Sequence, residues 1–333
     1  MATHTRAMLT ECQRLGVSWD PRTITPPADG QAAQALTQRL LAGWNKHGRP
    51  AGVHLDCNGL GARAVWHACQ QADVPCTATF HGAHRYLDPP SGAVLRLELE
   101  WLRDTTHVFA LHAGDLALLR AAGIERSSEL PHGVVDTERF HPRHRSLFRR
   151  QTWGAEADDP VVLWCGQFLA LKEPLRFGTI AQAVQDAVPR AQIVVVGDGP
   201  LRPALEQRLT RGHFLGSLIG QELSEVMASA DLLVFPSLVE TWGLVVGEAM
   251  ASGLAVVARD HAGAHRLIRS GVDGWTTRLD RPEDLTTAAV SLARDLPRAR
   301  QLGQAAVMRV AHWDWQRVAA AWIAHWRAHG VVA

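Results

Sequence analysis

The sequence predicts an α/β protein built from two doubly wound domains with parallel sheets. The chain has 333 residues, which suits two domains of ordinary size. Short apolar runs alternate with amphipathic helical stretches, as in repeated strand–helix–strand units. These apolar runs are continuous instead of alternating with polar residues, which is expected for strands covered on both faces of a parallel sheet.

The expected elements follow one another in a regular order along the chain. Strands are predicted at residues 52–56, 76–81, 107–111, 161–166, 192–197, 231–236 and 255–259. Helical periodicity lies between them, for example at residues 31–44, 61–72, 202–209 and 221–230. This order is typical of βαβ units joined in series.

A polar, charged segment without strand signal interrupts the pattern and predicts a solvated linker. We expect an N-terminal Rossmann-like domain at 1–145, this linker at 146–158, a C-terminal Rossmann-like domain at 159–309 and a C-terminal helix at 310–333 that packs back toward the N-terminal domain. In that helix Trp315, Trp322 and Trp326 fall near one face. We therefore expect them to anchor a core or a domain interface and not to bind ligand.

The composition argues against several classes of protein. Hydrophobic residues make up 47% of the chain and charged residues 20%, as in a globular protein, and the net charge of +1 gives no electrostatic reason to bind nucleic acid. The five cysteines form no CxxC pair and the 17 histidines show no ligand spacing, so we expect no metal site. The N-terminal stretch lacks the apolar region of a signal peptide, and no run reaches the ~18 apolar residues of a membrane-spanning helix. We expect a cytoplasmic protein without a transmembrane segment.

Ligands of doubly wound sheets bind beyond the carboxyl ends of the strands, and three such ends in the second half carry suggestive loops. In the first, Gly166 permits close backbone approach and Lys172 can reach a ligand as a point charge. In the second, Gly197 opens a Gly-Asp-Gly turn before a helix. Each of these loops alone is also common in ordinary α/β proteins, but three of them at one sheet edge indicate a binding site.

The third loop, PSLVETWGLVVGEAMASG at residues 236–253, carries two carboxylates in an otherwise apolar strand-to-helix turn. Glu240 precedes the helix that we expect near Gly243, and Glu248 lies two turns along the helix. The backbone N–H groups of Trp242, Gly243 and Leu244 would lie at the helix N-terminus. Free N–H groups and the positive end of the helix dipole at that place suit an anionic phosphate.

Together these segments resemble the donor domain of retaining GT-B glycosyltransferases, above all glycosyltransferase family four. That family reads G-R-x4-K, then GDGP, FxG, AD-x4-PS-x2-E-x-[FW]-G and EAMA-x-G. This chain has GQFLALK at 166–172, GDGP at 197–200, FLG at 214–216, ADLLVFPSLVETWGLVVGEAMASG at 230–253 and GVDGW at 271–275. The first half resembles the family's acceptor domain less strongly, through segments such as TATFHG at 77–82. The resemblance implies two Rossmann-like domains that face each other across a cleft.

The resemblance also implies roles for the carboxylates and the helix N-terminus. Glu248 would accept hydrogen bonds from the ribose hydroxyls of a nucleotide-diphospho-sugar, and Glu240 would contact hydroxyls of the transferred sugar. The amides of Trp242, Gly243 and Leu244 would hold the sugar or the distal phosphate. For Glu248 the alternative is an ordinary exposed helix residue.

The resemblance implies that Lys172 would neutralise the charge that grows on the leaving diphosphate, which is electrostatic stabilisation of the leaving group. Gly166, Gln167 and Gly197 would line the donor site. His81 would face the donor sugar from the acceptor domain, with a satisfied structural histidine as the alternative. The resemblance thus implies His81, Lys172 and Glu240 as catalytic residues, a UDP-, GDP- or ADP-linked donor, and neither metal nor cofactor.

Three departures from the family pattern bear on activity. Gln167 stands where the family has Arg, so the site loses a cationic, bidentate phosphate ligand. The loop AGAHR at 262–266 replaces GG-x2-E; Arg266 is a candidate for part of the missing charge, with a solvent-exposed Arg as the alternative. The chain also begins in what resembles the helix after the family's first strand. We expect either a late start or a first domain that lacks its first β unit.

The leading hypothesis is a retaining glycosyltransferase with an acceptor that these motifs do not define. Lipid-linked and polysaccharide acceptors are common in the family, which leaves peripheral association with the inner membrane face open. A catalytically weak or inactive nucleotide-sugar-binding protein is the second hypothesis, favoured by Gln167 and the short front. A GT-B-fold sugar-nucleotide epimerase is a remote third.

Overall fold

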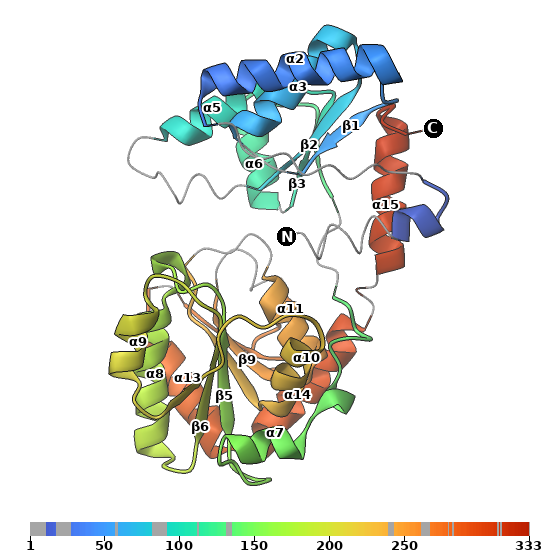
Figure 1. The fold of residues 1–333 in the computed structure, drawn as a ribbon. Coiled ribbons are helices and arrows are strands. Elements are labelled where there is room, and N and C mark those ends of the chain that lie inside the picture. Colours follow the sequence, from blue (N-terminus) through green and yellow to red (C-terminus); the bar gives the residue numbers. More distant parts are fainter. Residues whose placement is uncertain are drawn as a thin grey trace. The chain divides into compact units, whose positions relative to one another are not determined.

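The protein forms two compact units, and each is described by itself (Figure 1). The structure is a computed structural model that describes residues 11–17, 28–56, 59–81, 92–111, 113–130, 135–238, 243–260, 267–278, 280–281, 283–311, 313 and 315–332. Unit 1 comprises Met1–His132 together with Trp315–Ala333, and unit 2 comprises Gly133–Asp314.

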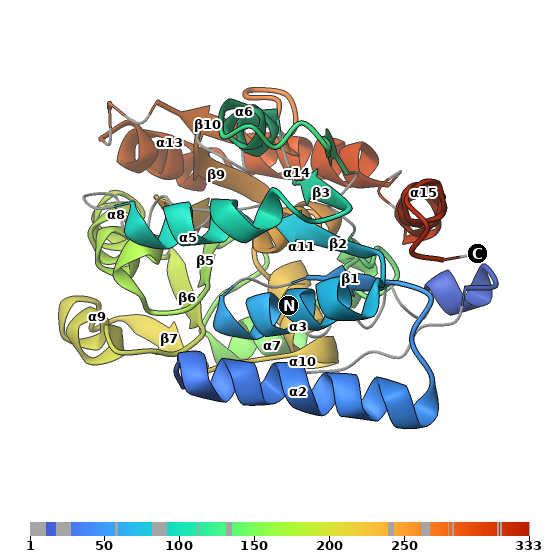
Figure 2. The same ribbon diagram turned by 90° about the horizontal axis from the view of Figure 1, so that it is seen from above.

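Unit 1 contains a parallel sheet of four strands in the order β1-β2-β3-β4. The strands are β1 Val53–Leu55, β2 Cys76–Phe80, β3 His107–Ala110 and β4 Ser127–Glu129, and the helices between and before them are α2 Gly30–His47, α3 Leu60–Ala72, α5 Ala93–Leu102 and α6 Ala113–Ala121. Strand order follows chain order without a reversal, so right-handed crossovers place α3, α5 and α6 on one face of the sheet (Figure 2). Outside them α2 packs on α3, where Thr37 Oγ1 donates to the Ala64 carbonyl at 3.0 Å.

The opposite face of this sheet is covered by α15, Trp315–Ala328, which comes from the other end of the chain (Figure 2). Trp322 and Trp326 are each 1% exposed, and their rings lie 5.2 and 5.4 Å from the imidazole of His54 on β1. The rings of His107 and His329 stack with their centroids 3.9 Å apart. Trp322 and Trp326 therefore pack as core residues, as predicted.

Unit 2 contains a parallel sheet of six strands in the order β10-β9-β8-β5-β6-β7. The strands are β5 Val161–Cys165, β6 Gln192–Val196, β7 Gly212–Phe214, β8 Leu232–Phe235, β9 Ala255–Arg259 and β10 Trp275–Thr277. The helical elements are η1 Pro142–His144, α7 Leu147–Thr152, η2 Ala170–Lys172, α8 Pro174–Ala187, α9 Arg202–Arg208, α10 Gly220–Ser229, α11 Leu244–Ala251, α13 Glu283–Arg294 and α14 Leu296–Val310. The order reverses beside β5, and such a switch point is where doubly wound sheets bind ligands.

Both faces of the unit 2 sheet are buried, which explains its continuous apolar strands. Leu163 and Leu233 pack into the layer of α10, α11 and α14, whereas Val162 and Leu232 pack into the layer of α8, α9 and α13. Every second residue therefore enters the same core. This two-layered burial places the loops at the carboxyl ends of β5, β6 and β8 on a rigid frame.

The segment 146–158, expected to be a solvated linker, instead packs into unit 2. Its Arg150 is 1% exposed and donates to Asp231 Oδ2 at 2.9 Å. Arg145 donates to Asp231 Oδ1 at 2.8 Å, and the Val161 amide donates to Oδ2 at 2.9 Å. The local charge pattern suggested solvation because the partner, Asp231, lies far along the chain at the start of β8.

Replacing Asp231 by asparagine should destabilise unit 2. The variant leaves the buried Arg150 guanidinium without its countercharge, and breaking such a buried pair costs about 3–5 kcal/mol. We expect calorimetry to show the unit 2 transition about 6–15 °C lower. The matched control is Glu225→Gln, which removes the more exposed pair with Arg149 (2.9 Å) and should shift the transition by less than about 3 °C. Equal shifts in both variants would show that Asp231 is not the anchor of this segment.

Candidate functional site

The carboxyl ends of β5 and β6 approach each other closely at the switch point of unit 2. The Gly166 amide donates to the Val196 carbonyl at 3.0 Å, and the Gly197 amide donates to the Gly216 carbonyl at 2.7 Å. Gly197 has φ +124°, and a Cβ at this position would lie 1.9 Å from the Gly166 carbonyl oxygen. Only glycine fits there, so the GDGP segment brings two predicted site residues side by side.

The loop after β5 carries Lys172 and is tied to the chain after β8. Lys172 closes the short 3-10 turn η2, and its amide donates to the Leu169 carbonyl at 2.9 Å. The neighbouring Leu171 carbonyl accepts from the Leu238 amide at 2.9 Å and from Ser237 Oγ at 3.2 Å. The turn that holds Lys172 therefore rests on the start of the PSLVETWG loop, whereas Gln167 in the same loop is exposed.

The N-terminus of α11 lies at this edge and has no side-chain cap. Gly243 occupies the N-cap position with φ +82°, and the helix proper begins at Leu244. The first amides of an α-helix have no partner within the helix, so as far as the described residues show, those at Leu244 and the next residue can donate to a ligand. Two predicted site residues in the same loop, Glu240 and Trp242, lie outside the described residues.

Glu248 on α11 is a half-buried carboxylate near Cys165 at the end of β5. It lies little more than one turn after the helix begins at Leu244, and not two turns along as expected. Burial raises its pKa to about 7, against which the nearby Arg139 acts in the opposite direction. The Cys165 thiol lies close enough for Glu248 to contribute to its raised pKa of about 12, which is caused mainly by burial. Within the described residues no hydrogen bond reaches the Glu248 carboxylate. A carboxylate in this state gains free energy from any ligand that donates hydrogen bonds to it.

His81 follows β2 at the carboxyl edge of the unit 1 sheet. Its Nε2 lies 3.1 Å from Asp56 Oδ1 at the end of β1, with the side chains 18% and 28% exposed. The pair arises because β1 and β2 are parallel neighbours whose ends meet at one edge. Asp56 was not among the predicted site residues, although it stands at the end of the strand expected at 52–56.

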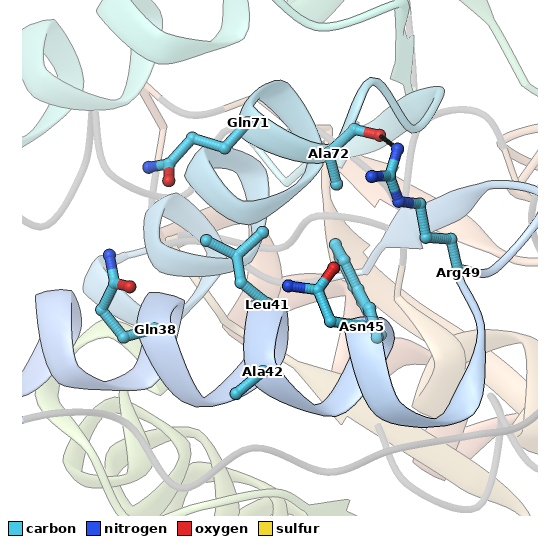
Figure 3. A pocket seen from close by; sticks show the side chains of 8 residues that line it. Gln38, Leu41, Ala42, Asn45, Arg49, Gln71 and Ala72 are labelled. Carbon is cyan, nitrogen blue, oxygen red and sulfur yellow. Dashed lines mark hydrogen bonds between the residues drawn. The ribbon is translucent and has the colours of Figure 1, made fainter.

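A groove of about 390 Å³ lies elsewhere in unit 1, between α2 and α3 (Figure 3). Gln38, Asn45 and Gln71 line it with amides, and Arg49 donates to the Ala72 carbonyl at 2.7 Å. Arg49 belongs to the loop between α2 and β1, so the end of the groove that Arg49 lines lies near the amino end of β1. None of the predicted site residues lines it.

The described residues contain neither a metal-binding cluster nor a membrane-spanning helix. Among the side chains that the structure places, no three His, Cys, Asp or Glu groups are arranged to hold a metal ion. In the same part of the chain, no helix combines the length and the apolar character needed to cross a bilayer.

The sequence of this chain matches a family of known proteins. Residues 159–295 match the family model for group 1 glycosyl transferases. A GDP-mannose-dependent alpha-mannosyltransferase of Mycolicibacterium smegmatis is 30% identical over 84% of this chain and 74% of its own length. Sulfoquinovosyl transferase SQD2 of Arabidopsis thaliana is 30% identical over 85% of this chain and 57% of its own length. The chain spans about half to three quarters of the length of the curated relatives described by these comparisons.

The fold agrees with this assignment. The structure of sucrose-phosphate synthase from Thermosynechococcus elongatus superposes with a TM-score of 0.82 at 21% identity, covering 98% of this chain and 92% of that one. The two parallel-sheet units are those of the GT-B fold, as predicted. Because residues 159–295 match the family model and a relative that is 30% identical is covered over 74% of its length, the chain belongs to the group 1 glycosyl transferases.

Proposed function

We propose that this protein is a retaining glycosyltransferase that takes its sugar from a nucleotide-diphospho-sugar. The observation that carries the proposal is Glu248, a half-buried carboxylate with a pKa of about 7 at the switch point. Two neighbouring ribose hydroxyls are the natural partners, because each can donate a hydrogen bond to one carboxylate oxygen. The buried part of this carboxylate needs a hydrogen-bond partner, and a ligand hydroxyl can supply one.

The rest of the donor then lies along the same sheet edge. The diphosphate faces the uncapped N-terminus of α11 at Gly243 and the ammonium of Lys172, and Glu240 binds hydroxyls of the transferred sugar. The proposal does not specify the nucleotide base of the donor. The Mycolicibacterium smegmatis relative is named for GDP-mannose, so GDP-sugars are the first donors to test.

The proposed reaction retains configuration at the sugar carbon and needs neither metal nor cofactor. The bond from this carbon to the diphosphate oxygen breaks as Lys172 stabilises the charge that develops on the phosphate. The acceptor oxygen attacks from the same face, and its proton passes to the departing phosphate oxygen. A nucleoside diphosphate leaves. His81, held by Asp56 within unit 1, is a further catalytic residue in this proposal.

One observation favours the second hypothesis, a nucleotide-sugar-binding protein with weak or no turnover. Gln167 is exposed in the loop after β5 and carries no charge where the family has Arg. The donor phosphates then depend on Lys172 and on backbone amides, which lowers the stabilisation available to the leaving group.

A thermal-shift panel with GDP-, UDP- and ADP-sugars tests the proposal. A ligand that binds only the folded state stabilises it by RT ln(1 + [L]/Kd), about 2.7 kcal/mol at a hundred times Kd. We expect one class of nucleotide sugar to raise the melting temperature and the free sugars to have no effect. Release of nucleoside diphosphate from the bound donor then separates a transferase from a binder. No shift with any of the three classes would overturn the proposal.

Restoring the family residue with Gln167→Arg should tighten donor binding. A guanidinium adds a charge-assisted, bidentate hydrogen-bond pair to a phosphate, so we expect Kd to fall about 10-fold. Isothermal titration measures this, with Gln182→Arg on the exposed face of α8 as the control for added charge. Weaker binding in Gln167→Arg would show that residue 167 does not face the donor phosphates.

A further inference from the structure

The residue after Lys172 adopts a backbone conformation that needs outside support. Glu173 has φ +50° and ψ +49°, and among the described residues it is one of two non-glycine residues with a positive φ. It stands between the turn η2 and the start of α8 at Pro174. Left-handed backbone at a residue with a Cβ is unfavourable and persists only where the surroundings hold it.

Arg259 provides that support from the end of β9. Its Nη2 lies 2.5 Å from Glu173 Oε2, and its side chain is only 5% exposed. Arg259 is held firmly because β9 lies between β8 and β10, with Arg259 itself paired in register with Thr277. Arg176, one turn along α8, lies 4.0 Å from the same carboxylate oxygen. Burial lowers the pKa of Arg259, and the Glu173 carboxylate opposes this effect.

The Lys172 turn is therefore pinned on both sides. On one side, Leu171 accepts hydrogen bonds from the chain after β8. On the other side, Glu173 is bound to the end of β9. Between these two attachments the backbone of Lys172 has little freedom to move relative to the carboxyl ends of β5, β8 and β9.

We propose that Glu173 and Arg259 form a positioning pair that fixes Lys172 at the donor site. The pair itself need not touch the donor: it acts by holding the turn so that the ammonium of Lys172 lies against the leaving phosphate. This inference rests on the proposed function for the role of Lys172, whereas the placement of Lys172 by the pair can be tested without any activity.

Sequence composition makes that direct test practicable. The chain has two lysines, Lys46 and Lys172. Reductive methylation with ¹³C-formaldehyde labels these two side chains and the N-terminus, and Lys46→Arg assigns the signals. We expect the Lys172 signal of the wild type to differ from that of Lys46, and to move toward it in Glu173→Gly and in Arg259→Met. The control is Arg278→Met, which removes a guanidinium directly after β10. The Arg278 side chain is 71% exposed and pairs with Asp280, so this variant should leave the Lys172 signal at its wild-type position.

Kinetics then test what the positioning does. We expect Glu173→Gly and Arg259→Met to lower kcat about 10- to 100-fold, with the donor KM changed less than about threefold, since the misplaced group acts mainly in the transition state. Glycine relieves the left-handed backbone, so a purely structural role for Glu173 predicts unchanged or higher kcat in Glu173→Gly. The double variant Glu173→Gly/Arg259→Met leaves neither charge buried alone and keeps the experiment readable if a single variant folds poorly.

A Lys172 signal at its wild-type position in both single variants and in the double variant overturns the inference, whether or not turnover is detected. A moved signal with wild-type kcat overturns the link from positioning to catalysis. A wild-type protein that neither binds nor turns over any nucleotide sugar counts against the proposed function alone, because the label still reports where Lys172 lies.

Discussion

Replacing Lys172 by methionine should lower kcat about 10²- to 10³-fold. Methionine keeps much of the apolar stem and removes the ammonium, so packing changes little while the charge at the leaving phosphate is lost. Removing one preorganised group that stabilises developing charge costs about 2.7–4 kcal/mol in other enzymes. Because Gln167 is neutral, this chain has one cation fewer in the loop after β5 than the family pattern, and the dependence on Lys172 should lie at the upper end of that range.

The matched control is Lys46→Met on α2 in unit 1, the other lysine of the chain, which should leave kcat unchanged. Steady-state kinetics with the donor identified by thermal shift supply the measurement. We expect the donor KM of Lys172→Met to rise less than its kcat falls, since the interaction is strongest in the transition state. If Lys172→Met lost affinity alone and kept kcat, its charge would serve ground-state binding only.

Replacing Glu248 by glutamine should weaken donor binding about 10- to 100-fold. Hydrogen bonds to a charged group contribute roughly 1.5–3 kcal/mol, and glutamine replaces one acceptor oxygen by a donor that the ribose hydroxyls do not match. The control Glu222→Gln, on the exposed first turn of α10, should bind donor as the wild type does. Equal affinity in both variants would remove Glu248 from the donor site.

Donor binding to the wild type should also depend on pH through Glu248. The pKa of about 7 means that part of the protein carries a protonated Glu248 near neutrality. Hydroxyl donors favour the ionised form, so donor binding releases a proton and affinity should rise about tenfold between pH 6 and pH 8. Titration in buffers of different ionisation enthalpy measures the released proton. Glu248→Gln should show neither the proton release nor the pH dependence.

Donor affinity should rise with pH, whereas the contribution of Glu248 to the stability of the donor-free protein should fall with pH. The folded state holds this proton more tightly than the unfolded state, so the contribution of Glu248 to stability is present below the ordinary glutamate pKa. It is lost as the pH rises through about 7. Donor binding should therefore stabilise the protein most at the pH where Glu248 alone stabilises it least.

Continuous apolar runs were sufficient to predict the long strands. All five residues of β5, and all four of β8, are buried, so no polar position interrupts the pattern. The strands β4, β7 and β10 were missed because their three residues, SSE, GHF and WTT, form no apolar run, whereas the equally short β1, VHL, stood in a recognisable strand-like stretch. Their pairing with a neighbouring strand, and not their own composition, makes them part of a sheet.

The sequence by itself determined the family and predicted where the candidate site lies, because its motifs depend on local requirements. Gly197 must be glycine where two strand ends meet, and an uncapped helix start must follow the Glu240 loop. Only the tertiary structure decided which charges are buried and what holds them. Arg150 meets Asp231, and Glu173 meets Arg259, across 81 and 86 positions of chain. Pairs so far apart leave no periodic signal, and burial, which raises the pKa of Glu248, exists only once both layers of helices have packed on the sheet.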